Sequence, residues 1–313
     1  MSGDANSLNC LLCSGKDLKK SDQLSGREIR LLWRELGKEF PPEAMVGIGQ
    51  NANMILWRCA GCGFEFFDPA LAGNSLFYQC LDSAEYYTPG RPEFSRTVRM
   101  AAQAGLANVL DVGCGAGDFL DLARTSGLKT FGLELNPAGA AKARAKGHVI
   151  FDRLLPDVPA DASPGGFDLI TLFQVLEHVP DPVGILKQAA ALLKLGGYIS
   201  VAVPFKSGLY RHLPWDPAQW PPHHISRWGL KDFQTLSKQT GLRLAESGGD
   251  ILLGSAIEHT LLLKQRLASV LGKRPRTQPS SWPVMASWFY RKSGLKFVAP
   301  HWGNSIYAHF QKA

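Results

Sequence analysis

Short apolar runs alternate with amphipathic stretches through the middle of the chain. The runs at 109–112, 167–173 and 198–203 are continuously apolar, as in parallel strands that are buried on both faces. Stretches with apolar positions at helical spacing separate them. The predicted helices cover 93–105, 137–147, 182–194 and 229–241, with one more from 119, and the other predicted strands cover 131–134, 149–151, 242–247 and 304–310. This repeat predicts an α/β fold built on a doubly wound, mostly parallel seven-stranded sheet.

The two ends of the chain follow different patterns. Residues 27–36 are apolar at helical spacing and predict a helix outside the repeat, while 64–67 is typical of a strand. Near the other end, 255–272 is amphipathic and 273–283 is basic and contains prolines. The predicted parts are an N-terminal module at 1–75, a connecting segment that covers the binding site at 76–92, an α/β domain at 93–250 plus 300–313, and a basic helical insertion at 251–299.

A glycine-rich turn interrupts the pattern where the run at 109–112 ends. Three alternating glycines, Gly113, Gly115 and Gly117, follow Asp111, and a helical stretch restarts directly after them. A strand, a glycine turn and a helix bring backbone amides close to a ligand at the helix N-terminus. Glu134 ends the next short strand, where an acid can accept hydrogen bonds from a ribose diol.

The glycines run G-x-G-x-G directly after an aspartate, which differs from the G-x-G-x-x-G spacing of dinucleotide-binding oxidoreductases. This stretch resembles motif I of the S-adenosylmethionine-dependent methyltransferases with a Rossmann-like fold. The same family pattern continues, in the same order, at 132–137, 167–182 and 195–204. The resemblance implies that the last strand, 304–310, is an antiparallel edge strand.

The resemblance also implies which residues bind S-adenosylmethionine. The glycines approach its methionine part, Asp111 orients the amino group or nearby waters, and Glu134 takes the ribose hydroxyls. Phe173 and Gln174 line the methyl side at the end of the strand 167–173. The predicted cofactor residues are Asp111, Gly113, Cys114, Gly115, Gly117, Glu134, Leu135, Phe173 and Gln174.

Two C-x-x-C pairs in the N-terminal module predict a metal site. Cys10 and Cys13 form one pair and Cys59 and Cys62 the other, and each pair can supply two adjacent corners of a tetrahedron around Zn²⁺. Free buried thiols or a redox pair are the alternatives. A four-cysteine zinc module before such a domain resembles the zinc-ribbon methyltransferases that modify sugars and other small metabolites.

Three histidines are candidates for a catalytic base, because an imidazole titrates near neutral pH. His178 follows the fourth-strand motif, and its alternative role is to fix the start of the next helix. His223 and His224 lie in an aromatic, proline-rich loop at 205–228, where substrate is expected to enter. The tryptophans of that loop, Trp215, Trp220 and Trp228, either stack on a substrate or pack the loop in place.

The distribution of charged residues indicates where an anionic partner is expected to bind. The chain of 313 residues has a net charge of +7, and nine lysines or arginines against one glutamate give 251–313 a net of +8. The rest therefore sums to −1, so an anionic partner such as a nucleotide-linked sugar, or peripheral contact with a membrane, is expected only at this segment. Solvated basic helix faces are the other interpretation.

The expected function is methyl transfer to oxygen or carbon of a small molecule, such as a sugar or a nucleotide-linked sugar. An RNA methyltransferase and a non-catalytic S-adenosylmethionine-binding protein are the alternatives; the separation of the basic segment from the cysteine module argues against nucleic acid. No apolar run approaches the length of about 18 residues that suggests a membrane span. The polar N-terminus predicts no signal peptide, so we expect a cytoplasmic protein.

Overall fold

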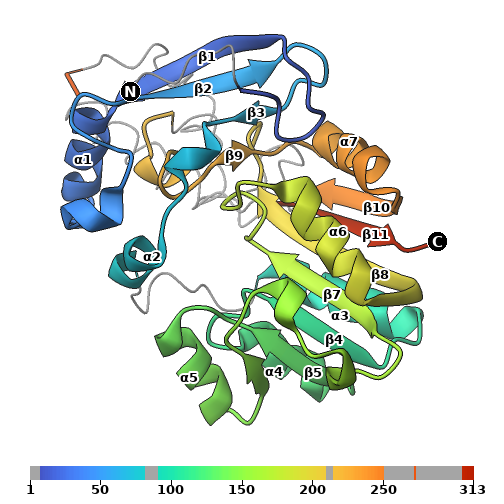
Figure 1. The fold of residues 1–313 in the computed structure, drawn as a ribbon. Helices are drawn as coiled ribbons and strands as arrows, with labels where there is room; N and C mark the ends of the chain where they lie inside the picture. The colour runs from blue at the N-terminus through green and yellow to red at the C-terminus, as the bar shows by residue number, and fades with distance from the viewer. Residues whose placement is uncertain (1–7, 82–90, 209–213, 250–270, 273–304) are drawn as a thin grey trace, which may run out of the picture.

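A computed structural model describes residues 8–81, 91–208, 214–249, 271–272 and 305–313 (Figure 1). The helical stretch expected at 255–272, apart from its last two residues, and with it nearly all of the basic insertion, lies outside the described residues. The described residues contain no helix that is long and apolar enough to cross a membrane.

The larger of two sheets has seven strands, as the apolar runs predict. Its order is β10 (Arg243–Gly249), β11 (Ser305–Gln311), β8 (Leu193–Pro204), β7 (Phe167–Phe173), β4 (Asn108–Val112), β5 (Lys129–Leu133) and β6 (Val149–Phe151). The five strands from β8 to β6 are parallel. The mostly parallel sheet is therefore confirmed.

The last strand of the chain runs antiparallel to its neighbours, as expected, but it is not an edge strand. β11 pairs with β8 on one side and with β10 on the other. Its central residues are fully or almost fully buried, which requires cover on both sides. A short apolar run cannot show whether a second strand pairs outside it, and here β10 takes the edge position.

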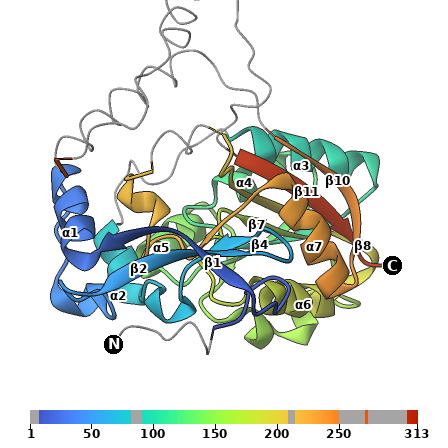
Figure 2. The same ribbon diagram turned by 90° about the horizontal axis from the view of Figure 1, so that it is seen from above.

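Helices cover both faces of this sheet. α3 (Pro92–Gln103) and α4 (Asp118–Thr125) lie on one side, and α6 (Pro182–Leu192) and α7 (Leu230–Thr240) on the other (Figure 2). α5 (Pro137–Ala145) packs beside β6. The side chains of β4 alternate between the two resulting cores, with Val109 in one and Leu110 and Val112 in the other. This is the doubly wound arrangement that the strand–helix repeat predicts.

One boundary differs from the prediction. α6 ends at Leu192 and β8 begins at Leu193, five residues before the predicted strand. The register between β7 and β8 shifts between Phe167 and Leu169, so the glycine turn at Gly196 forms an irregularity inside the strand. The turn was expected to precede the strand because Gly-Gly usually punctuates an element.

The second, smaller sheet belongs to the N-terminal module. Its order is β1 (Leu18–Ser25), β2 (Asn53–Cys59), β3 (Glu65–Phe66) and β9 (Ser226–Arg227), all antiparallel. The predicted helix is α1 (Gly26–Glu35), which a capping box between Ser25 and Glu28 starts. The fourth strand, β9, comes from the aromatic loop more than 150 residues further along the chain (Figure 1). Among the described residues, 3₁₀ helices cover Pro42–Met45, Pro69–Leu71, Leu155–Asp157, Ala160–Ala162 and Pro217–Gln219.

The segment between the two sheets contains a helix that the sequence pattern did not indicate. α2 (Ser75–Leu81) occupies the start of the predicted connecting segment. Phe77 is fully buried in a second core that also contains Trp33 and Trp220. Residues 76–81 are therefore packed structure.

Candidate active site

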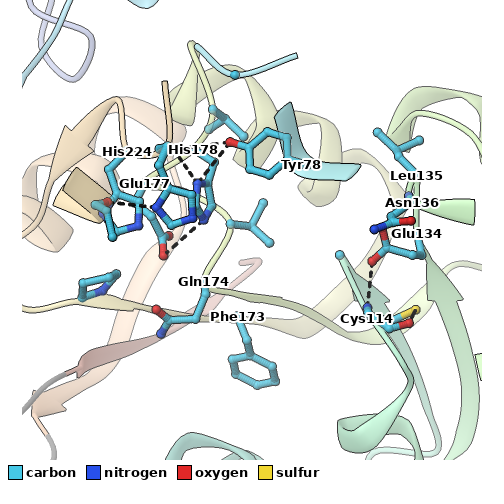
Figure 3. A pocket seen from close by; sticks show the side chains of 18 of the residues that line it. Tyr78, Cys114, Glu134, Leu135, Asn136, Phe173, Gln174, Glu177, His178 and His224 are labelled. Atoms are coloured by element: carbon cyan, nitrogen blue, oxygen red, sulfur yellow. Dashed lines mark hydrogen bonds and ion pairs between the residues drawn. The ribbon is translucent and has the colours of Figure 1, made fainter. Parts of the chain in front are cut away.

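A cavity of about 620 Å³ opens at the carboxyl ends of the central parallel strands, where open α/β sheets bind their ligands. Figure 3 shows two groups of side chains on opposite sides of it: Cys114, Glu134, Leu135 and Asn136 on one side, and Tyr78, Glu177, His178 and His224 on the other. We call the first group the donor end and the second, together with His223, the histidine end. Phe173 and Gln174 lie between them.

Glu134 fixes the glycine turn at the donor end. Its carboxylate accepts one hydrogen bond from the amide of Gly115 (2.8 Å) and one from the amide of Asn136 (2.7 Å). Gly113 and Gly115 have φ values of 73° and 54°, a region that L-residues other than glycine rarely enter. The turn therefore keeps its amides next to the acid that follows β5.

Cys114 and Gly117 differ from the neighbouring site residues. Cys114 lines the cavity, and its thiol also packs against Gly132, where a Cβ atom would lie 2.6 Å from the sulfur. Gly117 does not line the cavity and instead caps the N-terminus of α4. A Cβ atom at this position would lie 3.0 Å from the ring of His148 and 3.2 Å from the Cβ of Ala143, so only glycine fits. A cofactor contact of Gly117 stays a prediction.

Asp111 is buried at the end of β4 and lines the cavity. Its Oδ1 accepts a hydrogen bond of 2.6 Å from the hydroxyl of Thr171. Burial, together with the negative charge of Glu134, raises the pKa of Asp111 to about 7 even though the Thr171 hydrogen bond lowers it. The carboxyl can therefore change charge near neutral pH, where a cationic ligand would favour its ionised form.

Phe173 and Gln174 separate the two ends. The ring of Phe173 packs against those of Phe94 and Phe119 at centroid distances of 5.2 and 4.9 Å. Gln174 has a φ of 57°, a strained value for a residue other than glycine. The backbone N–H of Gln174 donates to the carbonyl of Ala202 (2.7 Å). The strained conformation thus ends β7 and turns the chain away from the strand beside the cavity.

The three candidate histidines are brought together at the histidine end. Ring centroids of His178 lie 4.7 Å from those of His223 and 4.9 Å from those of His224, and the last two rings stack at 4.5 Å. Burial lowers the pKa of His178 to about 4 and that of His223 to about 3, and it lowers the pKa of His224 as well. All three rings are therefore neutral at pH 7.

Two further residues of this end were not singled out from the sequence. Glu177 directly precedes His178, is 1% exposed, and has its pKa raised to about 8 by burial. The hydroxyl of Tyr78, on α2, lies 3.2 Å from Nδ1 of His178. The acid beside a histidine at a strand end was a usable signal for Glu177. Nothing local marks Tyr78, because it depends on an unexpected helix.

The small sheet holds the loop that carries His223 and His224. The amide of Phe67 donates to the carbonyl of Ile225, and that of Gly73 donates to the carbonyl of Pro222, both at 2.8 Å. From the other side, the amide of Ile225 donates to the carbonyl of Glu177 (2.7 Å). The loop is thus fixed between the N-terminal module and the turn that follows β7.

The loop tryptophans pack rather than face the cavity. Trp220 and Trp228 are fully buried, and none of the three tryptophans lines the cavity. The Arg227 guanidinium lies 5.1 Å from the ring centroid of Trp220 and 5.5 Å from that of Phe67. These contacts support the packing role among the two that the sequence left open.

The four predicted metal ligands, which come from the two C-x-x-C pairs, form one cluster. Sulfur atoms of Cys10 and Cys62, and of Cys13 and Cys59, lie 3.6 Å apart, and all four lie within 4.8 Å of one another. Four thiolates around Zn²⁺ at about 2.3 Å are separated by about 3.8 Å. Burial raises the pKa of Cys10 to about 11, so its neutral thiol is favoured unless a cation compensates the charge. The donor set fits a closed tetrahedral metal site.

Comparisons with known proteins agree with this geometry. The family model described as a methyltransferase domain matches residues 85–247, just over half of the chain. The ubiquinone biosynthesis O-methyltransferase of Sodalis glossinidius (strain morsitans) is 36% identical over 97 residues, 29% of this chain and 39% of that protein. The enzyme of the same name from Pseudomonas paraeruginosa is 35% identical over 104 residues, 31% of this chain and 45% of that protein. The matches thus span less than half of the length of these relatives.

Among solved structures, a SAM-dependent methyltransferase from Archaeoglobus fulgidus superposes with a TM-score of 0.44 at 17% identity, covering 70% of this chain and 94% of that one. The match of the family model is the stronger finding, because it contains the glycine turn, the strand that ends at Phe173 and the aromatic loop. The chain belongs to the methyltransferase domain family and has the α/β fold of its S-adenosylmethionine-dependent members.

Proposed function

We propose that this protein transfers the methyl group of S-adenosylmethionine to an oxygen or carbon atom of a small molecule. The observation that supports this most directly is the pairing of the two ends in one cavity: the donor end faces a cluster of neutral imidazoles across Phe173 and Gln174 (Figure 3). Such a cavity can hold a donor and an acceptor side by side, and alignment is the main contribution of a protein to this reaction.

The donor end fits S-adenosylmethionine. Glu134 lies where a ribose diol would bind, and Leu135, 56% exposed, offers an apolar surface beside it for the adenine. Asp111, with its pKa of about 7, becomes a carboxylate when a positively charged amino group binds next to it. Gly113 and Gly115 leave the methionine part in contact with the backbone.

The acceptor binds at the histidine end in this proposal. When bound, S-adenosylmethionine supplies a methyl group whose bond to sulfur breaks, with the electron pair going to sulfur, as the acceptor atom bonds to carbon. A hydroxyl or acidic carbon loses its proton in that reaction, and His178, His223 and His224 are the side chains placed to act on it. Because their pKa values are depressed, they are unprotonated at neutral pH and able to accept a hydrogen bond from the acceptor.

The relatives favour a hydroxyl-bearing acceptor, because those that match are named as O-methyltransferases of ubiquinone biosynthesis. A sugar or a nucleotide-linked sugar is the narrower acceptor class suggested by the zinc-ribbon methyltransferases. That version, the cytoplasmic location and contact of the 251–299 segment with an anionic partner or a membrane surface rest on the sequence alone.

We propose further that Cys10, Cys13, Cys59 and Cys62 hold one Zn²⁺ with a structural role. Four cysteine ligands leave no open position for a substrate. The cluster lies at the base of β2 and β3, next to the sheet in which β9 is the last strand. The zinc would therefore stabilise the module that holds the His223–His224 loop in place.

Replacement of Gly115 by valine tests the donor site. The side chain would force a β-branched residue into a φ of 54° beside Glu134, so S-adenosylmethionine affinity should fall by at least about tenfold, or about 1.4 kcal/mol. Gly127→Val is the matched control, because Gly127 also has a positive φ (90°) but has nothing within 4 Å of its Cβ position and does not line the cavity.

Calorimetry on the full chain measures both variants. Wild type and Gly127→Val should bind S-adenosylmethionine with a Kd of about 1 mM or tighter. Transfer of labelled methyl groups to a panel of phenols and sugars then reports activity. The absence of binding by the folded wild-type protein would overturn the proposed function, and equal binding by Gly115→Val would remove the glycine turn from the site.

A further inference from the structure

The three imidazoles at the histidine end meet the requirements of a metal site. One ring nitrogen from each of His178, His223 and His224 lies within 4.8 Å of a nitrogen of the other two. Imidazole nitrogens at about 2.0–2.1 Å from a shared ion are separated by about 3–3.4 Å, so a closure of less than about 2 Å completes the arrangement. The three histidines belong to segments that backbone hydrogen bonds join to one another, the aromatic loop and the turn after β7, and the same loop is bonded to the N-terminal module.

Backbone carbonyls select the tautomer that a metal requires. Nδ1 of His178 lies 2.7 Å from the carbonyl oxygen of His223, and Nδ1 of His223 lies 2.9 Å from that of Ala218. A carbonyl only accepts, so each Nδ1 carries the proton and each Nε2 keeps its lone pair. Histidines that bind metals are usually oriented in this way by a hydrogen bond from the other ring nitrogen.

A buried carboxyl provides a second, independent indication. Glu177 is 1% exposed, and its Oε1 lies 3.8 Å from Nε2 of His178. Among the described residues, its Oε2 has no hydrogen-bond partner. A buried carboxyl oxygen without a partner costs free energy, and a cation or a water molecule bound to that cation would supply the missing partner.

We propose that His178, His223 and His224 bind a divalent first-row transition metal ion, such as Zn²⁺ or Fe²⁺, with Glu177 as the hydrogen-bond partner of the water or hydroxyl in its fourth position. Neutral imidazoles favour these metals over Mg²⁺ or Ca²⁺. Three histidines leave a coordination position open, unlike the four cysteines. His178 and His224 line the cavity on the side opposite the donor end (Figure 3).

The role of the ion rests on the proposed function. A hydroxyl of the acceptor that coordinates the ion loses its proton more easily, because the cation stabilises the oxygen anion. With all three imidazoles bound to the ion, this proton passes to the carboxylate of Glu177 instead of to a histidine. The acceptor class is then an alcohol or a phenol, whose oxygen the ion places toward the methyl donor. The binding of the metal itself does not depend on methyl transfer and is tested without it.

The test counts metal ions on the full chain. At equilibrium with Zn²⁺ or Co²⁺, we expect two ions per wild-type chain, one at the cysteines and one at the histidines. His178→Ala and His224→Ala should each keep one. His309→Gln should keep two, because His309 is an equally buried histidine that bonds to Ser200 and does not line the cavity.

S-adenosylmethionine binding measured on the same samples reports folding, since the donor end lies across the cavity. An identical metal count in wild type and His224→Ala overturns the metal site. If the variants do not fold, the wild-type protein is used instead. It is loaded first with one equivalent of Zn²⁺, which should fill the cysteine site, and then with Co²⁺. X-ray absorption at the cobalt edge then reports the ligands of the second ion. Nitrogen and oxygen ligands around cobalt support the site, and a sulfur shell or an unbound ion overturns it. Loss of cofactor binding with two ions present would instead refute only the proposed function.

Discussion

Asp111 shows how the position of one carboxyl at a strand end determines its ionisation. It is 3% exposed, and burial raises its pKa from 3.8 to about 7. In the unfolded chain the same group loses its proton near pH 3.8. Between these values the unfolded state has released a proton that the folded state still holds, so the contribution of Asp111 to stability falls as pH rises from about 4 to about 7.

We therefore expect the unfolding free energy of wild type, relative to that of Asp111→Asn, to decrease over this interval and to level off above pH 7. Asp168→Asn serves as the control. Burial also opposes ionisation of Asp168, but the Lys194 ammonium at 2.8 Å and two backbone amides outweigh it and lower its pKa. Its contribution is present above pH 3.8 and lost as pH falls below that value.

Urea titrations at pH 4, 5.5, 7 and 8 measure the two differences. The difference for Asp111→Asn should fall between pH 4 and pH 7, while that for Asp168→Asn should stay constant, because Asp168 titrates below pH 3.8. A flat difference for Asp111→Asn would mean that the carboxyl is already ionised in the folded protein, which removes its proposed response to a cationic ligand.

At the scale of elements, the aromatic loop is defined by a partner far away in the sequence. Ser226 and Arg227 form β9 only because Glu65 and Phe66 lie beside them. The Cys59–Cys62 knuckle sits between β2 and β3, and Gly63 N–H donates to the carbonyl of Cys59 at 2.9 Å. Damage to the cysteine cluster should therefore loosen the loop that carries His223 and His224.

Cys59→Ser tests this connection. Removing one of four thiolates should release the proposed zinc, which contributes folding energy to its module. We expect amide hydrogen exchange in a peptide covering residues 219–228 to become at least about tenfold faster, about 1.4 kcal/mol in local opening free energy. Cys80→Ser is the matched control, because Cys80 is outside the cluster.

Metal analysis of the same two variants links the exchange to the ion. Cys80→Ser should keep its zinc and exchange as wild type does. Unchanged exchange at 219–228 in zinc-depleted Cys59→Ser would show that the module and the loop are held together by packing alone.

The sequence indicated the elements whose pattern is local. Strands such as 167–173 are continuously apolar, and α5 and α7 have turn residues at their ends. It did not indicate β1, whose residues LKKSDQLS are mostly polar because its exposed side chains face solvent. The pairing of β9, the placement of β11 between β8 and β10, and α2 with Tyr78 all depend on contacts between distant segments.

The same division holds for the site. The donor end lies within two consecutive strand–turn units and could be found from spacing. The grouping of three histidines with a buried acid requires the folded loop. His178 is separated from His223 by 45 residues, and no pattern in the chain links them.

At the scale of the whole molecule, the N-terminal module and the α/β domain share one continuous core. Cys10, Leu12, Phe64 and Phe66 pack in the same cluster as apolar residues of β4, β7, β8, α6 and α7. Units that bury a common apolar surface lose it together, so we expect the described parts to unfold as one cooperative structure.

S-adenosylmethionine provides the test, because its proposed site at the donor end contains none of the four cysteines. At a concentration of 100 times its Kd, a ligand that binds only the folded state stabilises it by about 2.7 kcal/mol. If the two parts unfold together, the cofactor should protect Cys10, Cys13, Cys59 and Cys62 from a thiol reagent in moderate urea by the same free energy that it adds to the tryptophan fluorescence transition. Gly115→Val, which should bind the cofactor at least about tenfold more weakly, is expected to show smaller shifts in both measurements. Protection of the fluorescence transition without protection of the thiols would mean that the module opens on its own, and the shared core would then not be strong enough to couple the cysteine cluster to the cavity.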